Sequence, residues 1–332
     1  MIGAGSWGTA VAAIAAGNAD TVLWARRKEL ADDIATRHRN TSYLPDRELP
    51  HHLQATASLE EAVSGASVLV MGVPSHGFRD VLGELLPYVG AAVPVVSLTK
   101  GVEQGSLKRM TEVVAELLPG HPAGVLTGPN LAKEIMAGYP AASVVAFAQD
   151  EVCENLQGVF TSKTFRVYRN TDVVGCEVAG ALKNVMAIAA GMADGMGFGD
   201  NTKAALMTRG LAELTRLGVA LGGQPLTFSG LAGMGDLIAT CSSPQSRNRH
   251  VGEELGKGRA LTEIVAEMNM VAEGVKTSRA VVDLARRVGV EMPIAEQVVA
   301  VLDGTTRAVD VIAALMQREM KSELHGIGKA PS

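Results

Sequence analysis

The sequence predicts an α/β domain with a mostly parallel sheet at the N-terminus, followed by an all-α domain at the C-terminus. Up to about residue 170, short runs of Val, Ile and Leu alternate with amphipathic stretches, a pattern typical of βα units. From residue 174 onward the apolar residues recur with a helical period. A chain of 332 residues also exceeds the usual size of one hydrophobic core. We therefore expect two domains, at residues 1–173 and 174–332.

The expected elements follow from these runs. Strands are predicted where apolar and β-branched residues cluster, at 21–24, 67–73, 94–98, 124–127, 143–147 and 165–168. Helices are predicted between them at 9–16, 78–86, 108–118 and 152–160. Only Met1 and Ile2 precede the first glycine, so the first strand has almost no residues of its own. In the second half, helices are predicted at 174–193, 202–221, 247–255, 261–268, 276–288, 293–302 and 307–317.

Composition and charge exclude several classes of protein. A net charge of −5 gives no overall field that would attract nucleic acid or acidic membranes, so a phosphate would need a local cluster of donors. The cysteines Cys153, Cys176 and Cys241 are odd in number and lack CxxC spacing, which argues against a disulfide framework or a zinc site. No run of about 20 residues is free of charges and turn signals, and no secretory signal is evident. We expect a soluble cytoplasmic protein without membrane insertion or bound metal.

The N-terminal glycines form a GxGxxG pattern, Gly3-Ala4-Gly5-Ser6-Trp7-Gly8, at the start of an Ala-rich helix. Such a turn lets the backbone approach a pyrophosphate, and the helix N-terminus supplies favourable partial charge. The six residues alone are a weak signal, but their position at the start of a βα pattern adds weight. The pattern predicts a Rossmann-type dinucleotide site.

The end of the second predicted strand bears on the choice of cofactor. An acidic residue there would bind the adenosine ribose of NAD, yet the chain has Arg26 and Arg27. Two guanidinium groups can pair with a 2′-phosphate, so the sequence favours NADP over NAD. The alternative is a solvated basic start to the next helix, and this is the interpretation preferred for Lys28.

Loops at 73–76, 99–101 and 127–130 follow later strands, at the edge where open α/β sheets bind ligands. Lys100 should emerge there and donate to a substrate oxygen or to the cofactor, although an exposed loop lysine is the commoner explanation. In 127–130, Gly128 shapes a turn and Asn130 is expected to cap the following helix. His76 is interpreted as structural.

The helix over 180–191 carries the sharpest signal, because Lys183 and Asn184 are its only strongly polar interior pair. Burial disfavours the charged form of lysine and lowers its pKa, which makes it a usable general acid or base for a hydroxyl or carbonyl group. Asn184 could hold the same oxygen. The alternative is that Lys183 extends along an apolar surface to reach water.

Two later motifs complete the candidate site. Asp236 follows the glycine-rich turn 230–235 and is expected to bind substrate hydroxyls or orient Lys183, and a helix N-cap is the alternative role. The run Ser246-Arg247-Asn248-Arg249 opens a short helix and combines hydroxyl, guanidinium and backbone N–H groups. This is an anion site of substrate size, although Arg249 could instead face solvent.

Taken in order, the segments GAGSWGTA, VPSH, TKG, GPNLAKE, GALKNVMAIAAG, NTKAALMTRG, GLAGMGDLIATC, SRNR and VAEGVKTS resemble bacterial NAD(P)-dependent glycerol-3-phosphate dehydrogenase, from Gly3 to about Glu323. The resemblance implies that Lys183 is the proton acceptor. It implies a cofactor site lined by Ser6, Trp7, Arg26, Arg27, Tyr43, Lys100, Ala132, Arg247, Val271 and Glu273, beside Gly3, Gly5 and Gly8. It implies a substrate site formed by Lys100, Gly128, Asn130, Lys183, Asp236, Ser246, Arg247 and Asn248. Many members have Ser where this chain has Asn130.

The resemblance further implies the interconversion of dihydroxyacetone phosphate and sn-glycerol 3-phosphate, which supplies glycerophospholipid synthesis, and a homodimer. The small phosphorylated substrate is expected to bind between the two domains. Two alternatives stay open. One is another hydroxyacid dehydrogenase of the same two-domain plan, with a carboxylate in place of the phosphate, and the other is a dinucleotide-binding sensor without turnover.

Overall fold

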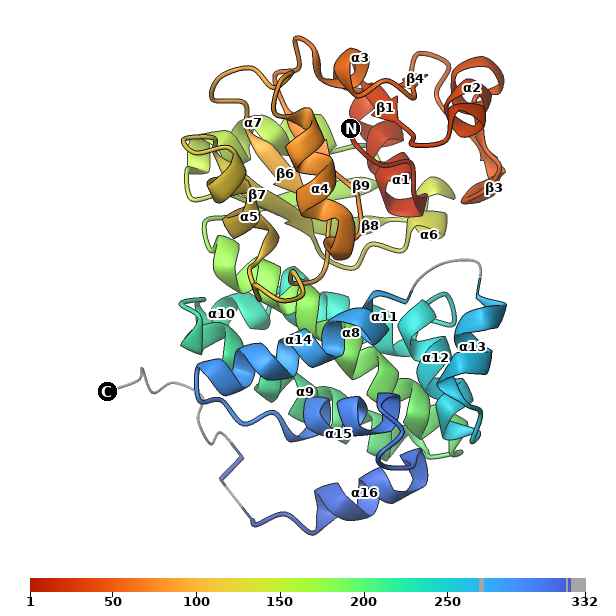
Figure 1. Ribbon diagram of the computed structural model, residues 1–332, viewed down its shortest axis with the longest axis vertical. Coiled ribbons are helices and arrows are strands. Elements are labelled where there is room, and N and C mark those ends of the chain that lie inside the picture. The colour runs from red at the N-terminus through yellow and green to blue at the C-terminus, as the bar shows by residue number, and fades with distance from the viewer. Residues whose placement is uncertain (269–271, 321, 324–332) are drawn as a thin grey trace. The chain divides into compact units, whose positions relative to one another are not determined.

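The computed structural model describes residues 1–332 except 269–271, 321 and 324–332 (Figure 1). The chain forms two compact units. The first comprises Met1–Thr99 and Arg109–Val173, and the second comprises Lys100–Lys108 and Val174–Ser332. The main division thus falls between residues 173 and 174, where the sequence changes period, but residues 100–108 group with the helical unit.

The sheet of the first unit is mostly parallel, as predicted. Its five main strands run in the order β5 (Leu69–Met71), β6 (Val95–Ser97), β7 (Ala123–Thr127), β8 (Ala141–Ala146) and β9 (Phe165–Asn170). Only the β7–β8 pair within this set is antiparallel. On the other side of β5, β1 (Val22–Trp24) pairs in parallel with β4 (Gln54–Thr56). The first strand is reduced to Ile2, which bridges Trp24 and Met71 and so joins the two parts of the sheet.

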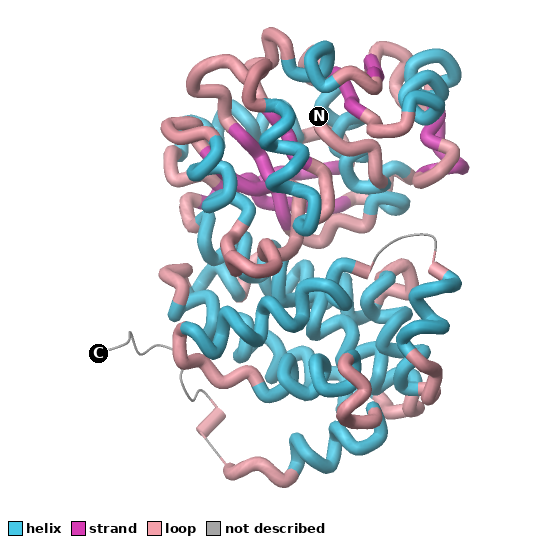
Figure 2. Tube along the Cα trace, viewed as in Figure 1, coloured by secondary structure: helices cyan, strands magenta, loops and turns pink. Residues whose placement is uncertain are grey.

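Helices cover both faces of this sheet (Figures 1 and 2). They are α1 (Ser6–Ala16), α2 (Lys28–Arg37), α3 (Leu59–Val63), α4 (Ser75–Leu85), α5 (Met110–Leu117), α6 (Ala132–Met136) and α7 (Asp150–Phe160). One core cluster joins α1 and α7 to the sheet through Val11, Leu126 and Phe160. A second cluster joins α4 and α5 to it through Phe78 and Val113. The arrangement is the doubly wound one expected for a dinucleotide-binding domain.

A short antiparallel hairpin, β2 (Arg39–Asn40) and β3 (Leu44–Glu48), follows α2 and lies outside the main sheet. The hairpin, β4 and α3 were not predicted, whereas helices were expected after Arg27 and after Asn130, without bounds. The β2 and β4 strands have two and three residues, too few for an alternating pattern to emerge. In α2 only Leu30, Ala31 and Ile34 are buried, so most of that helix reads as polar surface.

The regular elements of the second unit are all helices within its described part. Its elements are α8 (Val173–Gly195), α9 (Asp200–Ala220), α10 (Pro225–Phe228), a π-helical turn η1 (Leu231–Gly235), α11 (Asp236–Ser242), α12 (Arg247–Gly256), α13 (Leu261–Glu267), α14 (Glu273–Arg287), α15 (Pro293–Leu302) and α16 (Ala308–Met316). The core of this unit forms around α8, whose Leu182, Val185 and Ile188 are fully buried. By length and composition α8 could cross a membrane, but 89% of its apolar window is buried inside the protein, as in the core helix of a soluble protein.

Glycines bring α12 close to α8. A Cβ atom at Gly252 of α12 would overlap the carbonyl oxygen of Ile188, and one at Gly191 of α8 would overlap the carbonyl oxygen of Arg249. Both positions therefore require glycine for steric reasons. Their close contact fixes the start of α12 beside the helix that carries Lys183.

Candidate active site

The three glycines of the GxGxxG turn have different steric surroundings. Gly3 has φ +112°, and a Cβ there would lie 2.6 Å from the carbonyl oxygen of Gly72. A Cβ at Gly8 would overlap the carbonyl oxygen of Gly3. At Gly5, the residue before α1, a Cβ would meet nothing within 4 Å. Packing therefore explains Gly3 and Gly8, whereas Gly5 leaves open space at the helix N-terminus, which fits the approach of a pyrophosphate.

This difference predicts separable effects. Gly5→Val is expected to leave the melting temperature near that of the wild type and to weaken NADPH binding at least about tenfold, because its side chain fills the space beside the helix N-terminus. Gly8→Ala is expected to cost roughly 1–3 kcal/mol of stability through overpacking. Thermal unfolding and calorimetric titration with NADPH would measure both. Wild-type affinity in Gly5→Val would show that the pyrophosphate does not bind at this turn.

The end of β1 carries the two predicted arginines. Both Arg26 and Arg27 are exposed, and Arg27 donates from Nη2 to Oγ of Ser42 over 2.9 Å. Lys28 pairs with Asp32 over 2.8 Å on the surface of α2, which agrees with its interpretation as a solvated helix start. At this strand end, Arg26 and Arg27 are therefore the cations that can bind an anion, since Lys28 is paired with Asp32.

Tyr43 and Trp7 flank the start of α1. The half-buried Tyr43 accepts a hydrogen bond at its carbonyl oxygen from Oγ of Ser6, over 3.2 Å. Trp7 packs edge-to-face against Phe165, with ring centroids 6.1 Å apart. The buried Nε1 of Trp7 has no hydrogen-bond partner within the described parts of the chain. Ser6, Trp7 and Tyr43 thus lie together at the turn, and their role in cofactor binding stays a prediction.

The turn after β7 corrects one prediction. Asn130 does not cap the next helix, because α6 begins at Ala132 and the residue before it is Leu131, with φ −83° and ψ 100°. Both amide atoms of Asn130 are buried and have no hydrogen-bond partner among the described residues. Buried amides are normally hydrogen-bonded, so this one suits a ligand oxygen. Gly128 has φ +138°, a conformation that disfavours other residues.

Two lysines share one carboxylate in the second unit. Nζ of Lys183, on α8, lies 2.5 Å from Oδ1 of Asp236 and 2.6 Å from Oγ1 of Thr240. Nζ of Lys100 lies 2.6 Å from Oδ2 of the same Asp236. Side-chain exposure is only 8% for Lys183, 15% for Lys100 and 1% for Asp236. Lys183 therefore does not extend to water, and that alternative is wrong.

Asp236 is not a helix N-cap either. It is the first residue of α11, directly after the π-helical turn η1, and the residue before it, Gly235, already has helical dihedrals. Its carboxylate binds the two lysines. Thr240, which sequence reasoning missed, lies four residues later on α11 and donates to the carbonyl oxygen of Asp236. The i, i+4 spacing on one helix was the signal that could have identified it.

The charges of this cluster determine how easily it gives up a proton. Burial lowers the pKa of Lys100 from 10.5 to about 7; the carboxylate of Asp236 opposes this shift and the neighbouring Lys183 adds to it. Two ammonium groups and one carboxylate carry a net charge of +1. Because one proton can leave without depriving the carboxylate of a cationic partner, the cluster can release and take up a proton near neutral pH.

A chain of amides connects this cluster to α12 and α14. Asn184 donates to the carbonyl oxygen of Lys100 over 3.1 Å, Asn248 donates to the amide oxygen of Asn184 over 3.0 Å, and the N–H of Gly274 donates to Asn248 over 2.9 Å. Both amide oxygens are thus used within the protein. Each amide nitrogen carries a second hydrogen that can bind a ligand.

The start of α12 holds the residues of the predicted anion site. Ser246 caps the helix and accepts from the N–H of Arg249 over 3.2 Å, and Arg247 is exposed beside it. Arg249 does not face solvent freely, because it is half-buried and pairs with Asp194 over 2.6 Å and with Glu253 over 3.2 Å. It anchors α12 to α8. Glu273 begins α14, next to Gly274, whereas Val271 lies outside the described residues.

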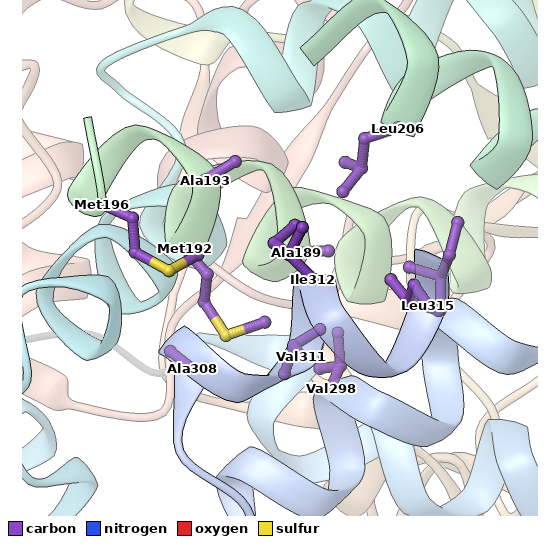
Figure 3. Close-up of a pocket in the computed structure, with 11 residues that line it drawn as sticks. Ala189, Met192, Ala193, Met196, Leu206, Val298, Ala308, Val311, Ile312 and Leu315 are labelled. Atoms are coloured by element: carbon purple, nitrogen blue, oxygen red, sulfur yellow. The ribbon is translucent and has the colours of Figure 1, made fainter. Parts of the chain in front are cut away.

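A pocket elsewhere in the second unit does not suit the proposed chemistry. Figure 3 shows it between α8, α9, α15 and α16, and its lining consists of Ala189, Met192, Ala193, Met196, Leu206, Ile294, Val298, Ala308, Val311, Ile312 and Leu315. All of these side chains are apolar, so none could donate to a phosphate. The pocket is a packing feature of the helical core.

The chain matches known proteins over almost its whole length. Residues 1–153 match the family of the NAD-dependent glycerol-3-phosphate dehydrogenase N-terminus, and residues 172–313 match that of the C-terminus. Glycerol-3-phosphate dehydrogenase [NAD(P)+] 2 of Sphingopyxis alaskensis is 58% identical over 325 residues, which are 98% of each chain. The glycerol-3-phosphate dehydrogenase [NAD(P)+] of Mycobacterium avium is 51% identical over 99% of this chain and 96% of that protein.

Solved structures agree. The crystal structure of glycerol-3-phosphate dehydrogenase from Coxiella burnetii superposes with a TM-score of 0.91 at 36% identity, over 96% of this chain and 98% of that one. The resemblance and the two-part fold predicted from the sequence are both confirmed. The chain belongs to the family of NAD-dependent glycerol-3-phosphate dehydrogenases.

Proposed function

We propose that this protein interconverts dihydroxyacetone phosphate and sn-glycerol 3-phosphate with NADP or NAD as hydride carrier. The observation that supports the proposal most is the buried cluster in which Lys183 and Lys100 share the carboxylate of Asp236. A protonated amine at this depth can serve an oxygen whose charge changes during the reaction.

Lys183 is the proposed proton carrier. The bound nicotinamide would supply or accept the hydride at C2 of the substrate. In reduction, Nζ of Lys183 passes a proton to the C2 oxygen as negative charge develops there, and in oxidation it receives that proton back. Asp236 and Thr240 fix the direction of the amine through bonds of 2.5 and 2.6 Å. Lys100 adds positive charge next to the same oxygen.

The substrate phosphate is assigned to the start of α12. Ser246, Arg247 and Asn248 present a helix N-terminus, a guanidinium and an amide within three consecutive residues. These groups would hold the phosphate away from the reacting carbon. Their loss should therefore raise KM for dihydroxyacetone phosphate, because they contribute to positioning rather than to proton transfer.

Between the two cofactors, we propose a preference for NADP. Arg26 and Arg27 stand at the end of β1, where an acidic residue would bind the ribose hydroxyls of NAD. Neither arginine pairs with a carboxylate of a described residue, so both guanidinium groups can bind a phosphate monoester.

Steady-state assays with both reduced cofactors test these proposals. NADPH should be oxidised in the presence of dihydroxyacetone phosphate, with a higher kcat/KM for NADPH than for NADH. The same assay with 2-oxo acids, including ketopantoate, should give little turnover, because a carboxylate would replace the phosphate. Turnover only with the oxo acids would indicate the alternative hydroxyacid dehydrogenase, and no turnover with any substrate would indicate a sensor.

The lowered pKa of Lys100 predicts a pH dependence of substrate binding. Lys100 binds the anionic substrate best when protonated, so its contribution is present below pH 7 and is lost as the pH rises through its pKa of about 7. We expect KM for dihydroxyacetone phosphate to rise between pH 7 and 9. Lys100→Arg, which stays charged over this range, should flatten the profile. An identical rise in that variant would rule out Lys100 as its source.

Location and assembly complete the proposal. We propose a soluble cytoplasmic enzyme, supported by the burial of α8 and the absence of paired cysteines among the described residues. We also propose a homodimer. Light scattering coupled to size-exclusion chromatography would test this directly, and a mass of one chain at micromolar concentration would contradict it.

A further inference from the structure

The segment between α2 and β3 is held against the glycine-rich turn by a buried asparagine. Nδ2 of the fully buried Asn40 donates to the carbonyl oxygen of Ala4 over 2.9 Å and to Oγ1 of Thr9 over 2.8 Å. Its Oδ1 accepts from the N–H of Tyr43 over 3.2 Å. One side chain thus fixes residues 40–43 relative to the start of α1.

The same segment has further attachments. The carbonyl oxygen of Tyr43 accepts from Ser6, and Asn40 pairs with Leu44 in the β2–β3 hairpin. Figure 1 shows β3 beside α2 at one edge of the first unit. Between these fixed points lies Ser42, which is exposed. Its hydroxyl therefore has a defined position without being buried.

Ser42 is directed toward the basic end of β1. Its Oγ accepts from Nη2 of Arg27 over 2.9 Å, which leaves the hydroxyl hydrogen free to donate to a ligand. Arg26 is exposed and has no bond with any described side chain. Asp32 pairs with Lys28 and Asp33 pairs with Arg37, so neither of these two carboxylates pairs with Arg26 or Arg27. The guanidinium of Arg27 and the hydroxyl of Ser42 thus stand together at the strand end that also carries Arg26.

We propose that Ser42 is a ligand of the 2′-phosphate of NADP and, with Arg26 and Arg27, sets the preference for this cofactor. The inference rests on the proposed NADP preference and adds a residue from a different segment of the chain. The hydroxyl donates to a phosphate oxygen while Arg27 binds the same group, and Asn40 positions the segment so that little ordering is needed on binding.

Calorimetric titration with 2′,5′-ADP and 5′-ADP tests this without turnover. The wild type should bind 2′,5′-ADP more tightly than 5′-ADP. Arg27→Ala should weaken the binding of 2′,5′-ADP at least about tenfold. Ser42→Ala should weaken 2′,5′-ADP about fivefold, the effect of one exposed hydrogen bond to a charged group, and leave 5′-ADP within about twofold. Ser42→Thr, which keeps the hydroxyl, should bind 2′,5′-ADP almost as tightly as the wild type.

Thr41→Ala is the matched control. Its hydroxyl donates to Asp33 rather than toward the arginines, so affinity for both nucleotides should stay at the wild-type level. If Ser42→Ala binds 2′,5′-ADP like the wild type, or weakens both nucleotides equally, Ser42 is not a phosphate ligand. If the wild type itself does not discriminate and Arg27→Ala has no effect, the NADP preference fails as well, whereas turnover of dihydroxyacetone phosphate remains a separate result.

Discussion

Replacing Lys183 by Ala is expected to lower kcat by about a thousandfold, within the range that one general acid or base contributes. Nζ of Lys183 is held at 2.5 Å from Asp236 and 2.6 Å from Thr240, and the loss of the amine leaves no group at the same atom position to carry the proton. NADPH binding should persist, because the glycine-rich turn and the two arginines lie in the other unit. Single-turnover kinetics and calorimetric titration with NADPH would measure the two effects separately.

Lys257→Ala is a suitable control for this variant. Lys257 follows α12 in the same unit and pairs with Glu253 and Glu254 at the surface, with 47% of its side chain exposed. Its kcat should equal that of the wild type. If Lys183→Ala kept even a tenth of wild-type kcat, with the pH dependence of kcat unchanged, another group would have to be the proton carrier.

The parts of the fold that were predicted from sequence are those with strong local patterns. β5, β6 and β7 were recognised from the Val- and Leu-rich runs at 67–73, 94–98 and 124–127, and α8 and α9 from a helical period that extends over 23 and 21 residues. The antiparallel direction of β8 was not predicted, because strand direction depends on how the chain connects in space. The grouping of residues 100–108 with the helical unit also depends on distant contacts, such as that between Asn184 and the carbonyl oxygen of Lys100.

The sequence predicted single residues of the site but not the contacts between them. Lys183 and Asp236 each stood out in their own segments, yet they are 53 positions apart, and their contact is set by the packing of α8 against α11. Sequence reasoning placed Asn130 at a helix cap because Asn favours that role. The helix instead begins two residues later, and whether a residue caps a helix depends on its backbone dihedrals, which one side chain does not determine.

Of the substitutions proposed, removing the carboxylate of Asp236 should lower the free energy of unfolding most. In Asp236→Ala, the ammonium groups of Lys100 and Lys183 would be buried without their counter-ion, which typically costs about 3–5 kcal/mol. Activity should also be lost, because the amine of Lys183 would no longer be held in one direction. Thermal unfolding and steady-state kinetics would measure these effects. Asp32→Ala, which removes an exposed partner of Lys28, should leave both nearly unchanged.

Two further measurements separate charge imbalance from lost packing in Asp236→Ala. Adding Lys100→Met to this variant removes one of the unpaired charges, so part of the stability should return while activity stays low. Raising the pH should also help. Asp236 opposes the burial that lowers the pKa of Lys100, so its removal lowers this pKa further below the wild-type value of about 7. The folded variant then gives up the proton at a lower pH than the wild type, and its loss of stability relative to the wild type shrinks as the pH rises through 7. A destabilisation that is the same at pH 6 and pH 9 and is unaffected by Lys100→Met would mean that Asp236 acts through packing alone.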